Sequence, residues 1–160
     1  MSMKLRFLIL TVFTIAISSS SFAQSKSRAY DNAAAIEEVI REAYINGVYN
    51  TGYMLSVTQG FSPDFTAIVF EDKDQSRLET IEDWIKKTEQ NKASGNLPLK
   101  GEQEVSFSIV KLEISNNIAN ACVQFMVGGK VQHTDFIGLY KFSTGWKLVN
   151  MMYEEGQEEK

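Results

Sequence analysis

Three strand-like runs follow one another in the segment IANACVQFMVGGKVQHTDFIGLYKFSTGWKLVNMMY, residues 118–153. β-Branched and aromatic residues are frequent in each run, and the short turn signals Gly128-Gly129 and Ser143-Thr144-Gly145 separate them. A fourth run lies just upstream, so we predict strands at 105–114, 118–127, 130–142 and 146–153. Because short turns join neighbouring antiparallel strands, the last third of the chain is predicted to form a meander.

Helical periodicity marks the segment before this meander. The apolar face of the first helix would hold Ile36, Val39, Ile40, Ala43, Tyr44, Gly47 and Val48, at spacings of three and four residues. We also predict a short helix at 54–58, a strand at 66–71, a polar turn at 72–76, and a third helix that Thr80 caps together with Asp83. A long loop at 91–104 is of the kind that often forms the rim of a site. This order predicts an α+β domain in which helices cover one face of a sheet.

The first 23 residues have the three-part form of a secretory signal peptide. Lys4 and Arg6 provide a positive start, an apolar run covers 5–17, and Ser21-Phe22-Ala23 resembles a cleavage site. The apolar run is shorter than the ~20 residues that span a bilayer, which argues against a permanent membrane anchor. We therefore predict cleavage after Ala23 and a periplasmic or secreted protein. Its parts would be a polar lead at 24–31, a single domain at 32–154 and a polar tail at 155–160.

Charge and composition exclude several classes of function. The chain has 16 Lys and Arg against 20 Asp and Glu, a net charge of −4, which becomes −6 once the signal peptide is removed. No basic stripe is present, so nucleic-acid binding is not expected. Cys122 is the single cysteine, which rules out an intramolecular disulfide. With one cysteine, one histidine and no recognisable ligand spacing, we predict neither a metal site nor a cofactor.

Motifs spread over the mature chain resemble the nuclear transport factor 2-like superfamily. They are YINGVY at 44–49, FSPDF at 61–65, TDFIGLYKF at 134–142 and GWKLVN at 145–150. Within the superfamily, they are most similar to exported bacterial proteins of the putative lumazine-binding and polyketide-cyclase types. The resemblance implies a cone-like curved antiparallel sheet packed against N-terminal helices, with a pocket between them, often in a homodimer. Relatives often have histidine where this chain has Ser62, so no role of that histidine is carried over.

The resemblance leaves the chemistry open, because the superfamily includes isomerases, dehydratases, cyclases, binding proteins and transport adaptors. Strand pairing offers a candidate site. A two-residue turn at 128–129 places Gln124 opposite His133 and Cys122 opposite Asp135. A three-residue turn at 143–145 places Tyr153 opposite Asp135, unless a bulge shifts the register. One face would then hold a polar cluster of His133, Asp135, Tyr153 and Gln124, bordered by Met126, Ile137 and Met151.

Two interpretations of this cluster stay open. In an apolar cup, Asp135 would act as a general base, with His133 and Tyr153 orienting substrate or stabilising charge. Alternatively, the opposite face packs against the helices, and the cluster is a solvated pair or part of a dimer interface. That opposite face would carry Val123, Phe125, Phe136, Tyr140, Trp146, Leu148 and Met152.

Aromatic side chains supply the candidates for ligand binding. Tyr49, Tyr53 and Trp84 would line a pocket for a small apolar or aromatic ligand, together with Gln124 and Met126, although core packing is the alternative for Trp84. Without a strong catalytic motif, we predict an exported small-molecule-binding or accessory domain. The alternatives are a cofactor-independent isomerase, dehydratase or cyclase, and a protein-interaction or dimerisation module. Apolar residues on both sheet faces predict a homodimer.

Overall fold

The computed structural model describes residues 29–72 and 74–155. The predicted signal peptide at 1–23 therefore lies outside the described residues, as do most of the polar lead and most of the tail. The chain divides into two compact units, Met1–Ala34 and Ala35–Lys160. In the first unit only residues 29–34 are described, and they are helical. In the described residues, no helix is both long enough and apolar enough to cross a membrane.

The predicted helices are present in the second unit. Residues 35–39 are α-helical and lead into η1 (Ile40–Thr51), whose wider turns are of the π type; α2 (Met54–Gly60), α3 (Ile81–Ala93) and the short η2 (Gly101–Gln103) follow. The predicted apolar face of η1 is confirmed, because Ile40, Ala43 and Tyr44 are buried. α2 lies directly against this helix, since a Cβ atom on Gly60 would be 2.2 Å from the Cβ of Ala43.

A capping box starts α3, as the sequence predicts. The Thr80 hydroxyl accepts a hydrogen bond from the Asp83 N–H, and the Asp83 carboxylate accepts one from the Thr80 N–H at 2.9 Å. The hydrogen bonds that the Thr80 N–H and hydroxyl donate to the Asp83 carboxylate lower the pKa of Asp83. The cap fixes the first turn of α3 and thereby directs Trp84 and Thr88 into the interior, where both are buried.

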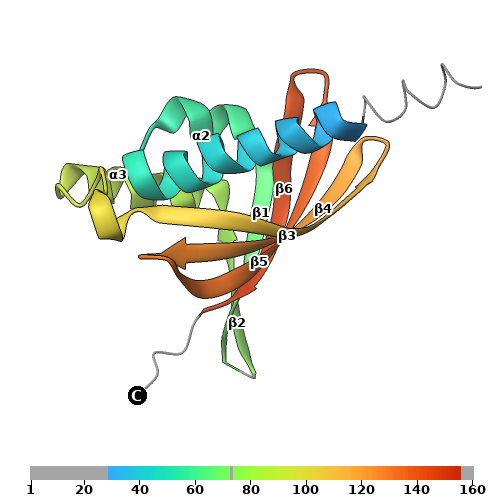
Figure 1. The fold of residues 1–160 in the computed structure, drawn as a ribbon. Helices are drawn as coiled ribbons and strands as arrows, with labels where there is room; N and C mark the ends of the chain where they lie inside the picture. The colour runs from blue at the N-terminus through green and yellow to red at the C-terminus, as the bar shows by residue number, and fades with distance from the viewer. Residues whose placement is uncertain (1–28, 73, 156–160) are drawn as a thin grey trace, which may run out of the picture. The chain divides into compact units, whose positions relative to one another are not determined.

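The sheet has six strands in the order β2-β1-β6-β5-β4-β3. They are β1 (Phe61–Asp72), β2 (Gln75–Thr80), β3 (Val105–Ser115), β4 (Ile118–Val127), β5 (Lys130–Phe142) and β6 (Gly145–Glu154). The meander from β3 to β6 confirms the prediction, and Figure 1 shows η1, α2 and α3 gathered on one side of the curved sheet. The α+β fold is therefore confirmed, with one difference: β1 pairs with β6 in parallel.

The predicted turn at 72–76 is too long, because strand β2 begins at Gln75. β1 in turn begins earlier than predicted, at Phe61, and so includes Pro63. Proline cannot donate to a strand ladder, and the pairing of β1 with β6 is interrupted between Phe61 and Thr66. This irregular pairing explains how a proline is accommodated inside a strand of the sheet.

The predicted pairing of β4 with β5 is wrong beyond Met126, because β5 contains a β-bulge. Val127 pairs with Lys130 as predicted, but Met126 pairs with Val131 and Phe125 with His133, so Gln132 is an extra residue. Beyond the bulge the register is one residue away from the prediction. Because neighbouring side chains in a strand point to opposite faces, this slip exchanges the faces of the β4 residues.

The predicted pairing across β5 and β6 holds near the site, but the turn differs. Phe142 pairs with Gly145, so the turn has two residues rather than three. A second bulge, between Gly138 and Leu139, then shifts the register back, and Ile137 pairs with Met151 as predicted. The two deviations compensate each other around the candidate site.

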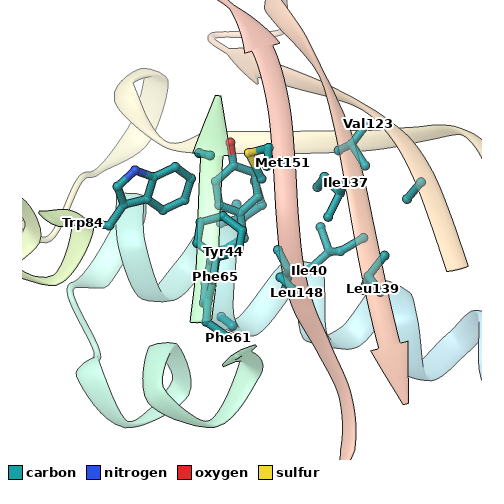
Figure 2. Packing of buried hydrophobic residues seen from close by; sticks show 14 of the residues in the cluster. Ile40, Tyr44, Phe61, Phe65, Trp84, Val123, Ile137, Leu139, Leu148 and Met151 are labelled. Atoms are coloured by element: carbon teal, nitrogen blue, oxygen red, sulfur yellow. The ribbon is translucent and has the colours of Figure 1, made fainter. Parts of the chain in front are cut away.

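The helix-covered face of the sheet carries the hydrophobic core. Figure 2 shows aromatic side chains at one end of this core, including Tyr44, Phe61, Phe65 and Trp84. Aliphatic side chains fill the other end, where Ile40, Val123, Ile137, Leu139 and Leu148 lie. The other face of the sheet, which we call the open face, carries Cys122, Phe136, Tyr140 and Met152. The residues of the predicted opposite face are therefore divided between the two faces.

Candidate functional site

A buried carboxylate lies at the centre of the helix-covered face. Asp135 is completely buried, and its Oδ2 accepts a hydrogen bond of 3.0 Å from the hydroxyl of Tyr44 in η1. A buried charge is costly unless it is paired and hydrogen-bonded. In the described part of the chain, the Tyr44 hydroxyl is therefore the side-chain donor that stabilises Asp135 in the core.

His133 lies between two aromatic rings. Its ring centroid is 4.5 Å from that of Phe125 and 4.9 Å from that of Tyr153, and both pairs are stacked. His133 Nε2 is 3.2 Å from Asp135 Oδ1, but the angle is not that of a hydrogen bond. Both atoms are buried and have no hydrogen-bond partner in the described part of the chain. The structure thus brings His133, Asp135 and Tyr153 together, as the strand pairing predicts. It places the three side chains in the interior of the domain, so His133 and Asp135 are not a solvated surface pair.

Three tyrosines around this pair have hydroxyl groups with a raised pKa. Burial is the main cause that raises the pKa of Tyr44, Tyr49 and Tyr153, and the nearby Asp135 charge raises all three further. Their hydroxyl groups are therefore neutral donors at physiological pH. This favours hydrogen bonding to a carboxylate or to a ligand acceptor, and it disfavours a phenolate base.

A cavity of about 190 Å³ lies beside the aromatic end of the core. η1 contributes Val48 and Tyr49, α3 contributes Trp84, Lys87, Thr88 and Asn91, the following loop contributes Asn96, Leu97 and Leu99, and Glu79 and Tyr153 come from β2 and β6. The predicted loop at 91–104 starts later than expected, because α3 continues to Ala93, but Asn96, Leu97 and Leu99 of this loop do form part of a cavity rim. Neither Asp135 nor His133 lines this cavity.

Glu79 fixes the indole of Trp84 at the cavity wall. Its Oε2 accepts a hydrogen bond of 2.6 Å from Trp84 Nε1, and its Oε1 accepts one of 3.0 Å from Arg77 Nε. Trp84 also stacks on Tyr44, with ring centroids 5.7 Å apart. Both alternatives for Trp84, core packing and pocket lining, are therefore true. One edge of the indole is anchored in the core, while the ring forms part of the cavity wall.

The structure separates the predicted ligand-binding residues into two groups. Tyr49 and Trp84 line the cavity, whereas Tyr53 is 55% exposed and does not. The placement of Gln124 and Met126 was wrong. The bulge at Gln132 puts them on the open face, because Val123 and Phe125 are the β4 residues that point to the helices. Glu79 and Lys87 are site residues that the sequence reasoning missed.

The described residues contain no group of three or more His, Cys, Asp or Glu side chains arranged to hold a metal ion. What the arrangement offers is a cavity with aromatic walls, and next to it a buried carboxylate hydrogen-bonded to a phenol. The first can bind a flat molecule, and the second can order the surrounding side chains.

Comparison with protein families gives a match over most of the domain. The sequence profile of the family described as "Putative lumazine-binding" matches residues 31–154. The chain belongs to this family. Family membership indicates a domain that binds a small-molecule ligand, and it leaves the ligand of this member open. No curated protein matches the chain.

Solved structures with the same fold come from several bacteria. An NTF2-like protein of unknown function from Shewanella baltica has a TM-score of 0.59 and 19% identity, over 78% of this chain and 93% of that chain. Another, from Silicibacter pomeroyi, has a TM-score of 0.62 and 15% identity, over 78% and 96%. A third, from Methylobacillus flagellatus, has a TM-score of 0.58 and 20% identity, over 79% and 94%. At these identities the likeness shows the nuclear transport factor 2-like fold alone.

Proposed function

We propose that this protein is an exported binding domain that holds a small, flat heteroaromatic molecule in the cavity between α3 and the sheet. The observation that carries the proposal is the lining of this cavity, where the rings of Tyr49, Trp84 and Tyr153 meet polar groups at Lys87 and Asn91. Mainly apolar walls with a few polar groups are typical of small-molecule sites.

The size of the cavity limits the ligand. Its volume of about 190 Å³ equals roughly six water molecules at about 30 Å³ each. Sites for drug-sized ligands usually measure about 300–1,000 Å³, so a molecule of one or two rings is favoured. The family description names lumazine, a flat bicyclic heterocycle with two carbonyl groups, and this class of compound suits the cavity. A larger ligand would require the loop around Leu97 and Leu99 to move.

Hydrogen bonding at the cavity suits a ligand with carbonyl oxygens. The Lys87 ammonium is a donor, the Asn91 amide both donates and accepts, and the Tyr153 hydroxyl keeps its proton because burial raises its pKa. A ring lying against Tyr49 and Trp84 would direct its polar edge toward these groups. Pteridine-diones and related imide heterocycles have this combination of a flat face and acceptor edges.

Binding is favoured over catalysis by Asp135 because of where that residue lies. A general base must come within about 2.6–3.2 Å of the proton that it removes. Tyr49 and Tyr153 line the cavity, while Asp135 is sealed beneath them with its Oδ2 bonded to Tyr44. The carboxylate therefore serves the proposed function by fixing Tyr44, which packs against both Tyr49 and Trp84.

Changing Lys87 to alanine is expected to weaken lumazine binding at least about tenfold, since a hydrogen bond to a charged group contributes roughly 1.5–3 kcal/mol. Isothermal titration calorimetry of the mature domain with lumazine measures the effect. Lys86→Ala is the matched control, because Lys86 is exposed on the same helix and does not line the cavity. Equal affinities of the Lys87 variant and the control would remove Lys87 from the site, and no heat with lumazine or other imide heterocycles would contradict the proposal.

Export is proposed from the signal-like N-terminus, with a mature chain that begins at Gln24. When the full-length gene is expressed in a Gram-negative host, the periplasmic fraction should contain the protein, and Edman sequencing should start at Gln24. Changing Ala23 to a bulky residue such as Trp should block cleavage, because signal peptidases require a small residue there. Soluble cytoplasmic protein that retains Met1 would contradict export.

We propose a homodimer through the part of the open face where Ile118, Tyr140 and Phe142 lie on the β4–β5 pair. Ile118 is 58%, Tyr140 39% and Phe142 40% exposed, and Tyr140 pairs directly with Ile118. Light scattering at micromolar concentration is expected to give twice the monomer mass. Tyr140→Glu should give a monomer, while Gln59→Glu on the exposed side of α2 should leave the dimer intact. A wild-type monomer would refute this interface.

A further inference from the structure

A second hollow lies where β1, β5 and β6 run side by side, with a volume of about 550 Å³. Phe70, Phe136 and Met152 form its apolar walls, and each is between 41% and 56% exposed. Glu154 and Glu155 add negative charge at the end of β6. This hollow is a different site from the cavity under α3, because Tyr153 is the single residue that lines both.

His133 connects this hollow to the buried carboxylate. Its imidazole is among the lining residues, yet Nε2 is buried and lies 3.2 Å from Asp135 Oδ1. The other ring nitrogen, Nδ1, has no hydrogen-bond partner among the described residues and is not one of the buried, unsatisfied atoms. Nδ1 is therefore the nitrogen that remains available to a molecule in the hollow. Stacking against Phe125 and Tyr153 holds the ring in this orientation.

The neighbouring carboxylate determines which nitrogen of His133 carries the proton. A carboxylate oxygen and an imidazole lone pair would repel each other at 3.2 Å, so the proton of the neutral ring belongs on Nε2. Nδ1 is then a hydrogen-bond acceptor. Asp135 acts here as a positioning residue, because it sets the tautomer of His133 without reaching the hollow itself.

Charge at the rim favours a cation. Glu155 forms an ion pair with Arg77, and Glu79 and Glu71 bind the same guanidinium group. Glu154 has no ion-pair partner in the described part of the chain. The hollow therefore combines apolar walls with the Glu154 carboxylate, His133 Nδ1, and the amide and hydroxyl groups of Gln132, Thr134 and Tyr153, which can both donate and accept. A ligand that matches this chemistry must bring both an apolar ring and N–H donors.

We propose that this hollow binds a small arylalkylamine, whose ring lies against Phe136 and Met152, whose ammonium group pairs with Glu154, and which donates a hydrogen bond to His133 Nδ1. The proposal concerns a site separate from the cavity under α3, so either one can fail without the other. It assigns binding to His133 and no reaction.

The single histidine of the chain allows a direct test. Two-dimensional ¹H–¹⁵N NMR of the imidazole, on the ¹⁵N-labelled mature domain, reports the tautomer and the ligand contact without assignment ambiguity. We expect the Nε2–H tautomer in the free protein and a saturable shift of Nδ1 on adding tryptamine. Tryptophol, which lacks the charge, should bind more weakly, and indole-3-acetate, which reverses it, weaker still. An Nδ1–H tautomer, or no saturable shift at millimolar tryptamine, would overturn the proposal.

Variants separate the contribution of each wall. Glu154→Gln should weaken tryptamine binding by two- to fivefold, the range of an exposed ion pair, and leave tryptophol unchanged. Phe136→Ala should weaken both ligands. Glu113→Gln and Val110→Ala are exposed controls on β3, outside the hollow, and should change the affinity for neither ligand.

Two results would refute the assignment. If Lys87→Ala abolishes the His133 shift, tryptamine binds in the other cavity. If Phe136→Ala instead converts a dimer into a monomer, a second copy covers the hollow.

Discussion

Replacing Tyr44 with phenylalanine is expected to lower the free energy of unfolding by about 3 kcal/mol, although the change removes a single oxygen atom. The hydroxyl of Tyr44 donates to Asp135 Oδ2 at 3.0 Å, and both side chains are fully buried. Phenylalanine keeps the stacking on Trp84 but leaves a buried carboxylate oxygen without its donor. The cost of an unsatisfied buried group is about 1–3 kcal/mol and is larger for a charged one.

Urea unfolding followed by circular dichroism measures this change. Tyr53→Phe is the matched control, because Tyr53 is 55% exposed and does not line the cavity, and its effect should stay within about 0.5 kcal/mol. Combining Tyr44→Phe with Asp135→Leu should recover part of the lost stability, since replacing both partners with apolar groups removes the unpaired charge. A Tyr44→Phe protein as stable as wild type would mean that this hydrogen bond does not support the core.

Replacing Trp84 with alanine is expected to cost about 3–5 kcal/mol, the usual range for a large aromatic residue in a core. Trp84 is 4% exposed, and its ring lies 5.2 Å from Phe65 and 5.8 Å from Phe61 between centroids. Figure 2 shows these rings together at one end of the core. The loss of the indole would also remove one wall of the ligand cavity and leave Glu79 Oε2 without its donor.

Two measurements separate the structural role of Trp84 from its role in binding. Urea unfolding of Trp84→Ala gives the stability term, with Leu78→Ala as an exposed control on β2 that should change it by less than about 0.5 kcal/mol. Binding is measured on Trp84→Phe, which keeps an aromatic ring and is therefore expected to fold. Lumazine affinity should fall several-fold in this variant. If the affinity is unchanged, the ligand does not lie against Trp84.

Helices and the C-terminal meander could be predicted because their signals are local. The spacing of Ile36, Ile40 and Tyr44, and the Thr80 cap, identify the helices without any tertiary information. Strand β2 was missed because it has no such local signal. As an edge strand it is mostly polar, and ion pairs of Arg77 with Glu71 and Glu79 hold its neighbourhood. No alternation of apolar residues marks such a strand in the sequence.

The site could be predicted only in part, because β-bulges have no clear sequence signature. His133, Asp135 and Tyr153 were placed together correctly, since a two-residue turn and a later bulge cancel in the β5–β6 register. Gln124 and Met126 were assigned to the wrong face, because the extra residue Gln132 shifts β4 against β5. The choice of face required tertiary information in any case, since both faces are apolar in sequence.

Cavity residues beyond the aromatics were hidden for a different reason. Lys87 and Glu79 have the sequence pattern of solvent-facing residues, and Lys87 is indeed exposed. Their place at the cavity depends on how α3 and the loop around Leu97 pack on the sheet. Charged residues at the mouth of a pocket look like ordinary surface residues until the opposing wall is known.

A crystal structure of the mature domain grown with lumazine tests the central claim most directly. We predict electron density for one flat molecule in the cavity under α3, in contact with the rings of Tyr49 and Trp84 and with a carbonyl oxygen within hydrogen-bond distance of Lys87 or Asn91. Asp135 should remain bonded to Tyr44 and out of contact with the ligand. An empty cavity at saturating lumazine, or a ligand bound directly to Asp135 after opening of the core, would contradict the account.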